Sequence, residues 1–232
     1  MIIKILRQQA PGAQPYWEEF AYDGSPDISV AALLDVLNYR DDITDVNGKK
    51  TTRIQWECSC LQGVCGACAM VINGTPALAC ETILKDLKKK KVTIRPLQKF
   101  PVIRDLVTDR SVIQEGLVQT NTYIGEYCPD EKEDHTHQYL AAKYLKCGLC
   151  LEVCPNYVNG KHFYGALFAN ECYLVSARNR QKADQIHTVY ASHFAKDCSK
   201  SLSCQEVCPV GIPAIASMGK LNRRRKKKGG GL

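Results

Sequence analysis

The sequence CLQGVCGAC, residues 60–68, and a further cysteine downstream decide the fold of the first half of the chain. The pattern joins four thiols: Cys60, Cys65, Cys68 and Cys80. A C-x4-C-x2-C loop with a distant fourth cysteine is the plant-type arrangement for a 2Fe–2S cluster. Gly63 and Gly66 allow the backbone to approach cluster sulfur closely and to offer N–H groups to it. Structural zinc sites favour two short cysteine pairs, and only one pair here has that spacing, so we expect a 2Fe–2S centre.

Strand and helix patterns surround this loop. Short apolar runs predict strands over 2–6, 17–22 and near 92–95. Apolar residues at helical spacing predict a helix over 29–39. Strands packed around one helix, with a cysteine loop at one edge, make an α+β domain, which we expect over residues 1–105.

The character of the chain changes after FPVIRDLVTDR, residues 100–110. The remainder has few β-branched runs, and helices are expected at about 133–146, 164–178, 183–195 and 212–226. The sequence therefore predicts an all-α domain over 106–222, followed by a basic, glycine-ended tail over 223–232.

Two cysteine runs lie between the expected helices, and both end in x3-Cys-Pro. They read Cys147-x2-Cys150-x3-Cys154-Pro155 and Cys198-x5-Cys204-x3-Cys208-Pro209. A bacterial two-cluster ferredoxin uses C-x2-C-x2-C-x3-C-P twice. Aligned on the shared ending, Tyr144 stands where the first run should have its first cysteine. Ser201 stands where the second run should have its second.

In such ferredoxins the fourth cysteine of each run binds the cluster of the other run. This rule gives two groups of three thiols: Cys154, Cys198 and Cys204, and Cys147, Cys150 and Cys208. A non-ligand at Ser201 leaves an open corner in the first group, which favours a 3Fe–4S cluster. A 4Fe–4S cluster in the second group needs a fourth ligand. An alternative register, with three residues deleted after Cys150, gives the same count.

Composition supports metal rather than disulfides. The 232 residues include 13 cysteines, an odd number that cannot all pair within one chain. With 45% hydrophobic and 24% charged residues, the chain is not wholly disordered. No apolar run is long enough to span a bilayer, and the start MIIKILRQQAPG lacks a signal-peptide core. We therefore expect a reducing, cytosolic compartment, where thiols bind metal.

At this point the chain resembles the iron–sulfur subunit of the succinate dehydrogenase/fumarate reductase family (respiratory complex II). The family loop C-R-E-G-x-C-G-x-C-A-M-x-I-N-G is similar to residues 60–74, and its linker R-P-L-x-x-F-P-V-I-R-D-L-V is similar to residues 95–107. The C-x5-C-x3-C-P run is the family spacing for a 3Fe–4S centre. Leu61-Gln62 replaces the usual Arg-Glu beside the first cluster, which should shift its potential modestly.

The resemblance implies a β-grasp plant-type ferredoxin domain followed by a helical ferredoxin domain. It also implies three clusters in a line, which pass electrons between an FAD-containing flavoprotein subunit and a quinone in a membrane anchor subunit. The chain itself would carry no catalytic residue, and the enzyme would be a quinone-linked oxidoreductase of the tricarboxylic acid cycle or of anaerobic respiration. Carried over, the ligands are Cys60, Cys65, Cys68 and Cys80 for 2Fe–2S; Cys147, Cys150 and Cys208 for 4Fe–4S; and Cys154, Cys198 and Cys204 for 3Fe–4S.

Three thiols remain: Cys58, Cys128 and Cys172. Cys58 does not fit the first spacing and is expected to be a spare thiol. The missing fourth ligand could come from Cys128, Cys172, His135 or His137, or from a water. Cys128 is the first choice, because it lies upstream of the motif, where a loop could fold back.

The quinone, menaquinone or ubiquinone, has weaker candidates. The family often has a Trp a few residues after the Cys-Pro of the first run, whereas this chain has Asn-Tyr-Val-Asn over 156–159. Pro155 and Ser199 are therefore only weak candidates for its site. The same polar stretch leaves room for an alternative, a soluble fumarate reductase that takes electrons from a thiol or another non-quinone donor.

The formal net charge of +7 owes much to the tail, where residues 223–228 are all basic. Such a run is either a solvated tail or an attraction to an anionic membrane surface. With the family resemblance, we expect the chain at the cytoplasmic face of a bacterial inner membrane. A zinc-stapled nucleic-acid binder fails on the cysteine spacing, so no nucleic-acid partner is expected.

Overall fold

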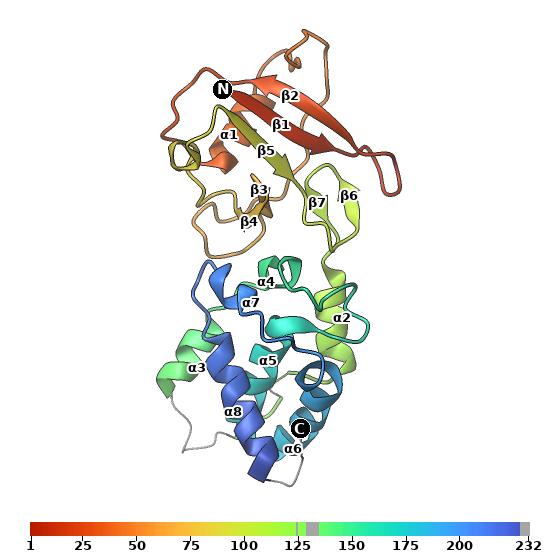
Figure 1. Ribbon diagram of the computed structural model, residues 1–232, viewed down its shortest axis with the longest axis vertical. Helices are drawn as coiled ribbons and strands as arrows, with labels where there is room; N and C mark the ends of the chain where they lie inside the picture. The colour runs from red at the N-terminus through yellow and green to blue at the C-terminus, as the bar shows by residue number, and fades with distance from the viewer. Residues whose placement is uncertain (124, 129–134, 228–232) are drawn as a thin grey trace. The chain divides into compact units, whose positions relative to one another are not determined.

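The computed structural model describes residues 1–123, 125–128 and 135–227, with the side chains of 224–227 outside the description. The chain divides into two units, Met1–Asp109 and Arg110–Leu232 (Figure 1). Every strand of the described residues falls in the first unit, and the second is built from helices. An α+β region followed by an all-α region is confirmed. Among the described residues, no helix combines the length and the apolar character needed to cross a membrane.

A five-stranded sheet forms the framework of the first unit. Its strands are β1 (Ile2–Arg7), β2 (Tyr16–Ala21), β3 (Ala69–Ile72), β4 (Thr75–Leu78) and β5 (Lys91–Arg95). They lie side by side in the order β2-β1-β5-β3-β4. β1 and β5 are parallel, and the other neighbouring pairs are antiparallel. Asn73 and Gly74, both with positive φ, form the turn between β3 and β4.

One helix, α1 (Val30–Asn38), and a 3₁₀ turn, η1 (Leu84–Leu87), complete this layer of the unit. The hydroxyl oxygen of Ser29 accepts a hydrogen bond from the N–H of Ala32 at 3.1 Å and caps the helix. The buried face of α1 is apolar: Val30, Ala31, Leu33, Leu34 and Leu37. Alternate residues of β1 are buried as well, because side chains along a strand point to opposite faces.

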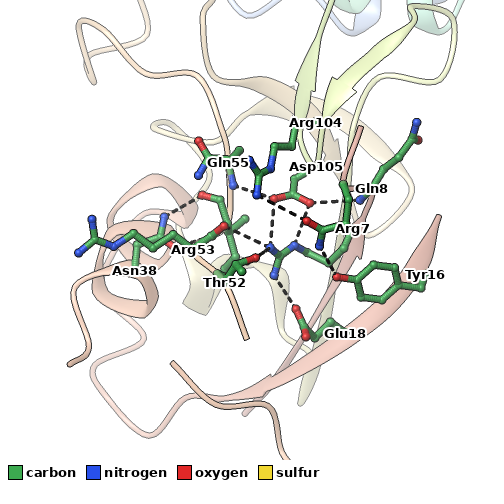
Figure 2. Close-up of polar contacts among 12 residues, drawn as sticks. Arg7, Gln8, Tyr16, Glu18, Asn38, Thr52, Arg53, Gln55, Arg104 and Asp105 are labelled. Atoms are coloured by element: carbon green, nitrogen blue, oxygen red, sulfur yellow. Dashed lines mark hydrogen bonds and ion pairs between the residues drawn. The ribbon is translucent and has the colours of Figure 1, made fainter. Parts of the chain in front are cut away.

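The last buried residue of β1 is charged. The guanidinium of Arg7 contacts Asp105, Glu18 and the backbone of residues 52–53 (Figure 2). Asp105 stands in the turn of a small hairpin, β6 (Val102–Arg104) and β7 (Val107–Thr108). Its N–H also donates to the carbonyl oxygen of Gln8 at 2.8 Å. The hairpin therefore belongs to the first unit, which ends at Asp109.

The second unit consists of α-helices and two short helical segments of other types. They are α2 (Ser111–Gln119), α3 (His135–Ala142), α4 (Leu149–Glu152), α5 (Gly165–Arg178), η2 (Arg180–Lys182), α6 (Ala183–Tyr190), the π-helical turn η3 (Ala191–Ala195), α7 (Ser203–Glu206) and α8 (Ala214–Lys227). α5 is buried along nearly its whole length and contacts α3, α4, α6 and α8. It is the centre of the helical core.

Three of the expected helices are confirmed: α5, α6 with its π-helical turn, and α8. The helix expected over 133–146 ends earlier, at Ala142, since the chain must turn before the first cysteine run. Lys146 takes part in that turn with a φ of 53°. α2 was not expected, although Ile113 and Leu117 lie one helical turn apart and are buried. The basic tail begins inside α8, and residues 228–232 lie outside the described residues.

Candidate metal centres

The β3–β4 hairpin brings the ends of the first cysteine motif together. Cys68 immediately precedes β3, and Cys80 follows closely after β4. Because Ala69 pairs with Leu78 in the hairpin, the two cysteines are neighbours, and their sulfur atoms are 3.4 Å apart. Cys60 and Cys65 lie in the loop before the hairpin and interact with each other. The structure therefore gathers all four thiols that the spacing predicts.

Backbone N–H groups point at these sulfur atoms. The N–H of Gly63 donates to Cys80 at 3.3 Å, that of Gln62 to Cys60 at 3.4 Å, and that of Ala67 to Cys65 at 3.5 Å. The hydrogen bond from Gln62 lowers the pKa of Cys60 to about 7, whereas burial and then Cys68 raise the pKa of Cys80 to about 11. Donors already aimed at sulfur fit a cluster, because N–H bonds to thiolates stabilise their negative charge and tune the potential.

The two later cysteine runs have the same backbone path. α4 and α7 each begin after a residue in the left-handed region, Gly148 (φ 87°) and Leu202 (φ 65°). Lys146 and Lys200, two residues earlier in each run, are also left-handed, with φ of 53° and 59°. This match fixes the register on the backbone and favours the alignment without a deletion. It makes the following residues equivalent: Tyr144 and Cys198, Cys147 and Ser201, Cys150 and Cys204, Cys154 and Cys208.

The thiols of the two runs meet in two cavities. One, named the Cys147 cavity, is lined by Cys147, Cys150 and Cys208 together with Tyr144, Asn170 and Cys204. The other, named the Cys154 cavity, is lined by Cys154, Cys198 and Cys204 together with Ser199, Ser201 and Phe194. Thiols of both runs meet in each cavity, as the crossing rule predicts, and Cys204 lies in the wall of both.

Burial and mutual repulsion act on these thiols. Burial raises the pKa of Cys150 well above its ordinary value, and Cys147 raises it further. Burial also raises the pKa of Cys204, with an added contribution from Cys154. Thiolates crowded in this way are unfavourable alone but suit a bound cation, because a metal holds its thiol ligands deprotonated. Both cavities therefore have the donor chemistry of an iron–sulfur site.

The described residues include no group of three or more His, Cys, Asp or Glu that converges closely enough for a single metal ion.

Two supporting residues escaped the sequence reasoning. Nη1 of Arg110 donates to the carbonyl oxygen of Cys147 at 3.1 Å and holds the start of the first run. Nδ2 of Asn170 donates to the carbonyl oxygen of Ala141 at 2.9 Å, and its Oδ1 accepts from Ser217. The signal for Asn170 was a polar residue on a helix that is mostly apolar and buried.

Tyr144 replaces a cysteine at the edge of the Cys147 cavity. Tyr144 lines the cavity, and its hydroxyl group donates a hydrogen bond to Oε2 of Glu171 on α5. Glu171 is not among the described residues that line the cavity. Burial raises the pKa of both side chains. The phenol of Tyr144 therefore stays protonated near neutral pH. The hydroxyl is thus directed to α5 and not to the thiols.

The structure places the proposed fourth ligands elsewhere. The backbone of Cys128 pairs with Arg178 and Arg180 at the end of α5, through N–H···O bonds of 3.0 and 2.8 Å. That end is about 12 Å along the helix from Asn170 in the cavity wall, at about 1.5 Å per residue. Within the described chain, neither Cys128 nor Cys172 lines the Cys147 cavity, and Cys172 is fully buried inside α5.

The two candidate histidines are no nearer. His135 is exposed at the start of α3. Nε2 of His137 lies 3.0 Å from the hydroxyl oxygen of Ser217 on α8, a buried contact that joins the two helices. Neither histidine lines the Cys147 cavity within the described residues. Cys58, the expected spare thiol, is exposed.

The weak quinone candidates differ in position. Ser199 lines the Cys154 cavity, and its N–H donates to Oδ1 of Asn156 at 3.4 Å. Pro155 is not among the described residues that line this cavity, although its neighbour Asn156 is. Ser199 therefore has the stronger structural basis of the two.

Three groups of cysteines on one chain, one in an α+β unit and two in a helical unit, define an iron–sulfur electron-transfer protein. Residues 2–115 match the family described as "2Fe-2S iron-sulfur cluster binding domain". Residues 145–212 match the family described as "4Fe-4S dicluster domain".

Relatives over the full length narrow the assignment. The chain is 33% identical to the succinate dehydrogenase iron–sulfur subunit of Bacillus subtilis, covering 94% of this chain and 90% of that one. It is 32% identical to the fumarate reductase iron–sulfur subunit of Mycobacterium tuberculosis, covering 78% and 75%. The chain belongs to the family of succinate dehydrogenase and fumarate reductase iron–sulfur subunits.

The fold agrees with this family. A chain of the Mycobacterium smegmatis Sdh1 complex in the apo form superimposes with a TM-score of 0.75 at 23% identity, covering 98% of this chain and 96% of that chain. At this identity the likeness concerns the fold alone.

Proposed function

We propose that this chain is the electron-transfer subunit of a complex II-type enzyme, passing electrons between a flavoprotein succinate/fumarate site and a membrane quinone. When bound, the three iron–sulfur clusters supply one-electron redox steps. The chain's own residues hold the clusters, set their surroundings and exclude water. No residue of this chain is proposed to act on succinate or fumarate.

The observation that carries the proposal is the shared wall of the two cavities. Cys204 and Ala166 line both the Cys147 cavity and the Cys154 cavity. Clusters bound there would be separated by little more than these side chains, and electron transfer is fast only over short distances. A pair of metal sites with one common wall therefore supports a relay rather than two independent structural staples.

The ligand sets follow from the gathered thiols. We assign the 2Fe–2S cluster to Cys60, Cys65, Cys68 and Cys80; the 3Fe–4S cluster to Cys154, Cys198 and Cys204; and the remaining cubane-type cluster to Cys147, Cys150 and Cys208. The first unit, Met1–Asp109, is then a β-grasp ferredoxin domain, and the second, which begins at Arg110, is a helical ferredoxin domain; a boundary at 105/106 would divide the β6–β7 hairpin.

The partners follow from the family. An FAD-containing subunit would hold succinate or fumarate, and a membrane anchor would hold menaquinone or ubiquinone near the Cys154 cavity and Ser199. The chain would then lie at the cytoplasmic face of the inner membrane, with the basic run that starts at Arg223 facing anionic lipid headgroups.

Reduction of the purified complex tests the proposal. Succinate should reduce the clusters, and a quinone analogue should reoxidise them, with both steps followed by EPR. A Cys154→Ser variant should lose the 3Fe–4S signal and quinone reduction, while the flavoprotein still oxidises succinate with an artificial acceptor. A colourless chain without iron, or a fully active complex that contains no membrane subunit, would overturn the proposal.

A further inference from the structure

The Cys147 cavity has a tyrosine at the position where the second run has its first cysteine. The fourth cysteine in its wall, Cys204, also lines the Cys154 cavity and belongs to the ligand group proposed for that cavity. The shared backbone path makes Tyr144 the equivalent of Cys198, the first cysteine of the second run. A cubane cluster with four protein ligands would need a thiolate at this position, since Cys147, Cys150 and Cys208 supply the others. The residue at this corner therefore decides whether the cluster has a fourth protein ligand.

Tyr144 is the residue at this corner. It lines the cavity together with Cys147, Cys150 and Cys208, and its hydroxyl group donates a hydrogen bond to Glu171. The ammonium group of Lys146, two residues further along the chain, lies 5.6 Å from the centre of the Tyr144 ring. Glu171 stands on α5, which is buried along nearly its whole length, so the hydrogen bond ties Tyr144 to the central helix of the unit.

The other possible ligands are held by contacts of their own. Cys128 is tied by its backbone to the far end of α5, and His137 is bonded to Ser217. Cys172 is enclosed within α5. Bringing any of them to the corner would require these contacts to break.

We propose that the cluster held by Cys147, Cys150 and Cys208 has one iron without a protein ligand, and that Tyr144, positioned by Glu171, closes that corner without binding iron. The corner iron is then removable and replaceable. On oxidation by a one-electron oxidant, [4Fe–4S]²⁺ gives [3Fe–4S]⁺, Fe²⁺ and one electron, so charge and iron balance. This inference rests on the proposed function, because it requires the cluster to be present.

The redox potential of this cluster would then depend on whether the corner iron is bound. Loss of the corner iron changes the charge of the cluster and hence its potential, while the three thiolates keep the remaining iron atoms in place. Tyr144 and Glu171 are positioning residues in this account. They shape the corner and touch neither substrate nor quinone.

The test uses the intact complex, purified without oxygen and treated with ferricyanide and EDTA. The EPR signal of the oxidised 3Fe–4S state should rise about twofold per chain, with loss of about one iron atom, because two clusters would then be in that state. Fe²⁺ and dithionite should reverse the change. A complex isolated with the doubled signal already present supports the same conclusion.

Substitutions distinguish a corner iron without a protein ligand from a corner iron that has one. Tyr144→Cys supplies the missing thiolate and should retain the iron through the same treatment, with no rise of the signal. Tyr144→Phe keeps the ring and should lose iron as readily as the wild type. Cys128→Ser and Cys172→Ser are the matched controls and should also behave as the wild type.

Three results would overturn the inference. The first is a wild-type cluster that keeps all its iron and a single 3Fe–4S signal. The second is a Tyr144→Phe variant that loses iron more readily than the wild type, which would make the phenol a ligand. The third is the same defect in Cys128→Ser or Cys172→Ser. A chain that contains no iron in any form would instead overturn the proposed function, so the two failures are distinguishable.

Discussion

Oδ1 of Asp105 lies 3.0 Å from Nε of Arg7, and both side chains are fully buried. The carboxylate also accepts hydrogen bonds from the N–H groups of Gln8 and Gln55, at 3.1 and 3.0 Å. It therefore joins the first strand, the long loop before the cysteine motif and the hairpin at the end of the unit (Figure 2). A buried charge pair of this kind is costly to break, because removing one partner leaves the other uncompensated.

Asp105→Asn should lower the free energy of unfolding of the first unit by about 3–5 kcal/mol. Chemical denaturation followed by tryptophan fluorescence reports this unit, since Trp17 and Trp56, the two tryptophans of the chain, both lie in it. The control is Asp42→Asn, which removes an exposed ion pair with Lys50 and should cost under about 1 kcal/mol. Equal effects of the two variants would contradict this role of Asp105.

Cys60 and Cys80 should react at different pH in the cluster-free chain. The pKa of Cys60 is lowered to about 7, so its thiolate is abundant at neutral pH, whereas that of Cys80 is raised to about 11. Alkylation by iodoacetamide, followed by mass spectrometry, should label Cys60 first between about pH 7 and 9, because the thiolate is the nucleophile. The preference should disappear in denaturant, and equal labelling rates without denaturant would refute it.

Gly165 should not tolerate a side chain. It begins α5 with a φ of 76°, and an added Cβ would lie 2.3 Å from Cδ2 of the buried Leu151. Gly165→Ala should destabilise the helical unit by about 1–3 kcal/mol through strain and overpacking. The measurement is the temperature at which the visible absorbance of the clusters is lost. Gly116→Ala in α2, where a Cβ would lie at an ordinary contact distance of 3.5 Å from the ring of Tyr164, should leave that temperature unchanged or raise it slightly.

Ser201→Cys should convert the 3Fe–4S site of the Cys154 cavity to a 4Fe–4S site. Ser201 lines this cavity with the three thiols and corresponds to Cys147 of the first run, so a thiolate there could bind a fourth iron. EPR of the oxidised complex should show loss of most of that site's signal, together with a gain of about one iron atom per chain. Ser203→Cys, two residues away and absent from the cavity wall among the described residues, is the control. An unchanged signal in Ser201→Cys would place Ser201 away from the open corner.

The sequence was a good guide where the signal is local. The strand at the N-terminus and the helix expected over 29–39 depend on residues close together in the chain, and the structure confirms them. The helix at 111–119 was missed because its apolar residues are few and no capping side chain marks its start.

For the cluster ligands too, the local spacing of cysteines was predictable from the sequence. Spacing alone predicted which cysteines belong to the first motif, because a cluster-binding loop requires closely spaced thiols and freely turning glycines. Spacing also showed that Tyr144 and Ser201 stand at cysteine positions. These conclusions required no knowledge of distant contacts.

Only the tertiary structure decided what faces the gap at Tyr144. Helix α5 brings Glu171 to its hydroxyl group, and the same packing keeps Cys128 at the far end of that helix. The buried pair of Arg7 and Asp105 was equally invisible, because their partnership spans nearly the whole first unit. The physical reason is that spacing along a chain limits only nearby residues, whereas contacts between distant ones depend on how the helices and strands pack.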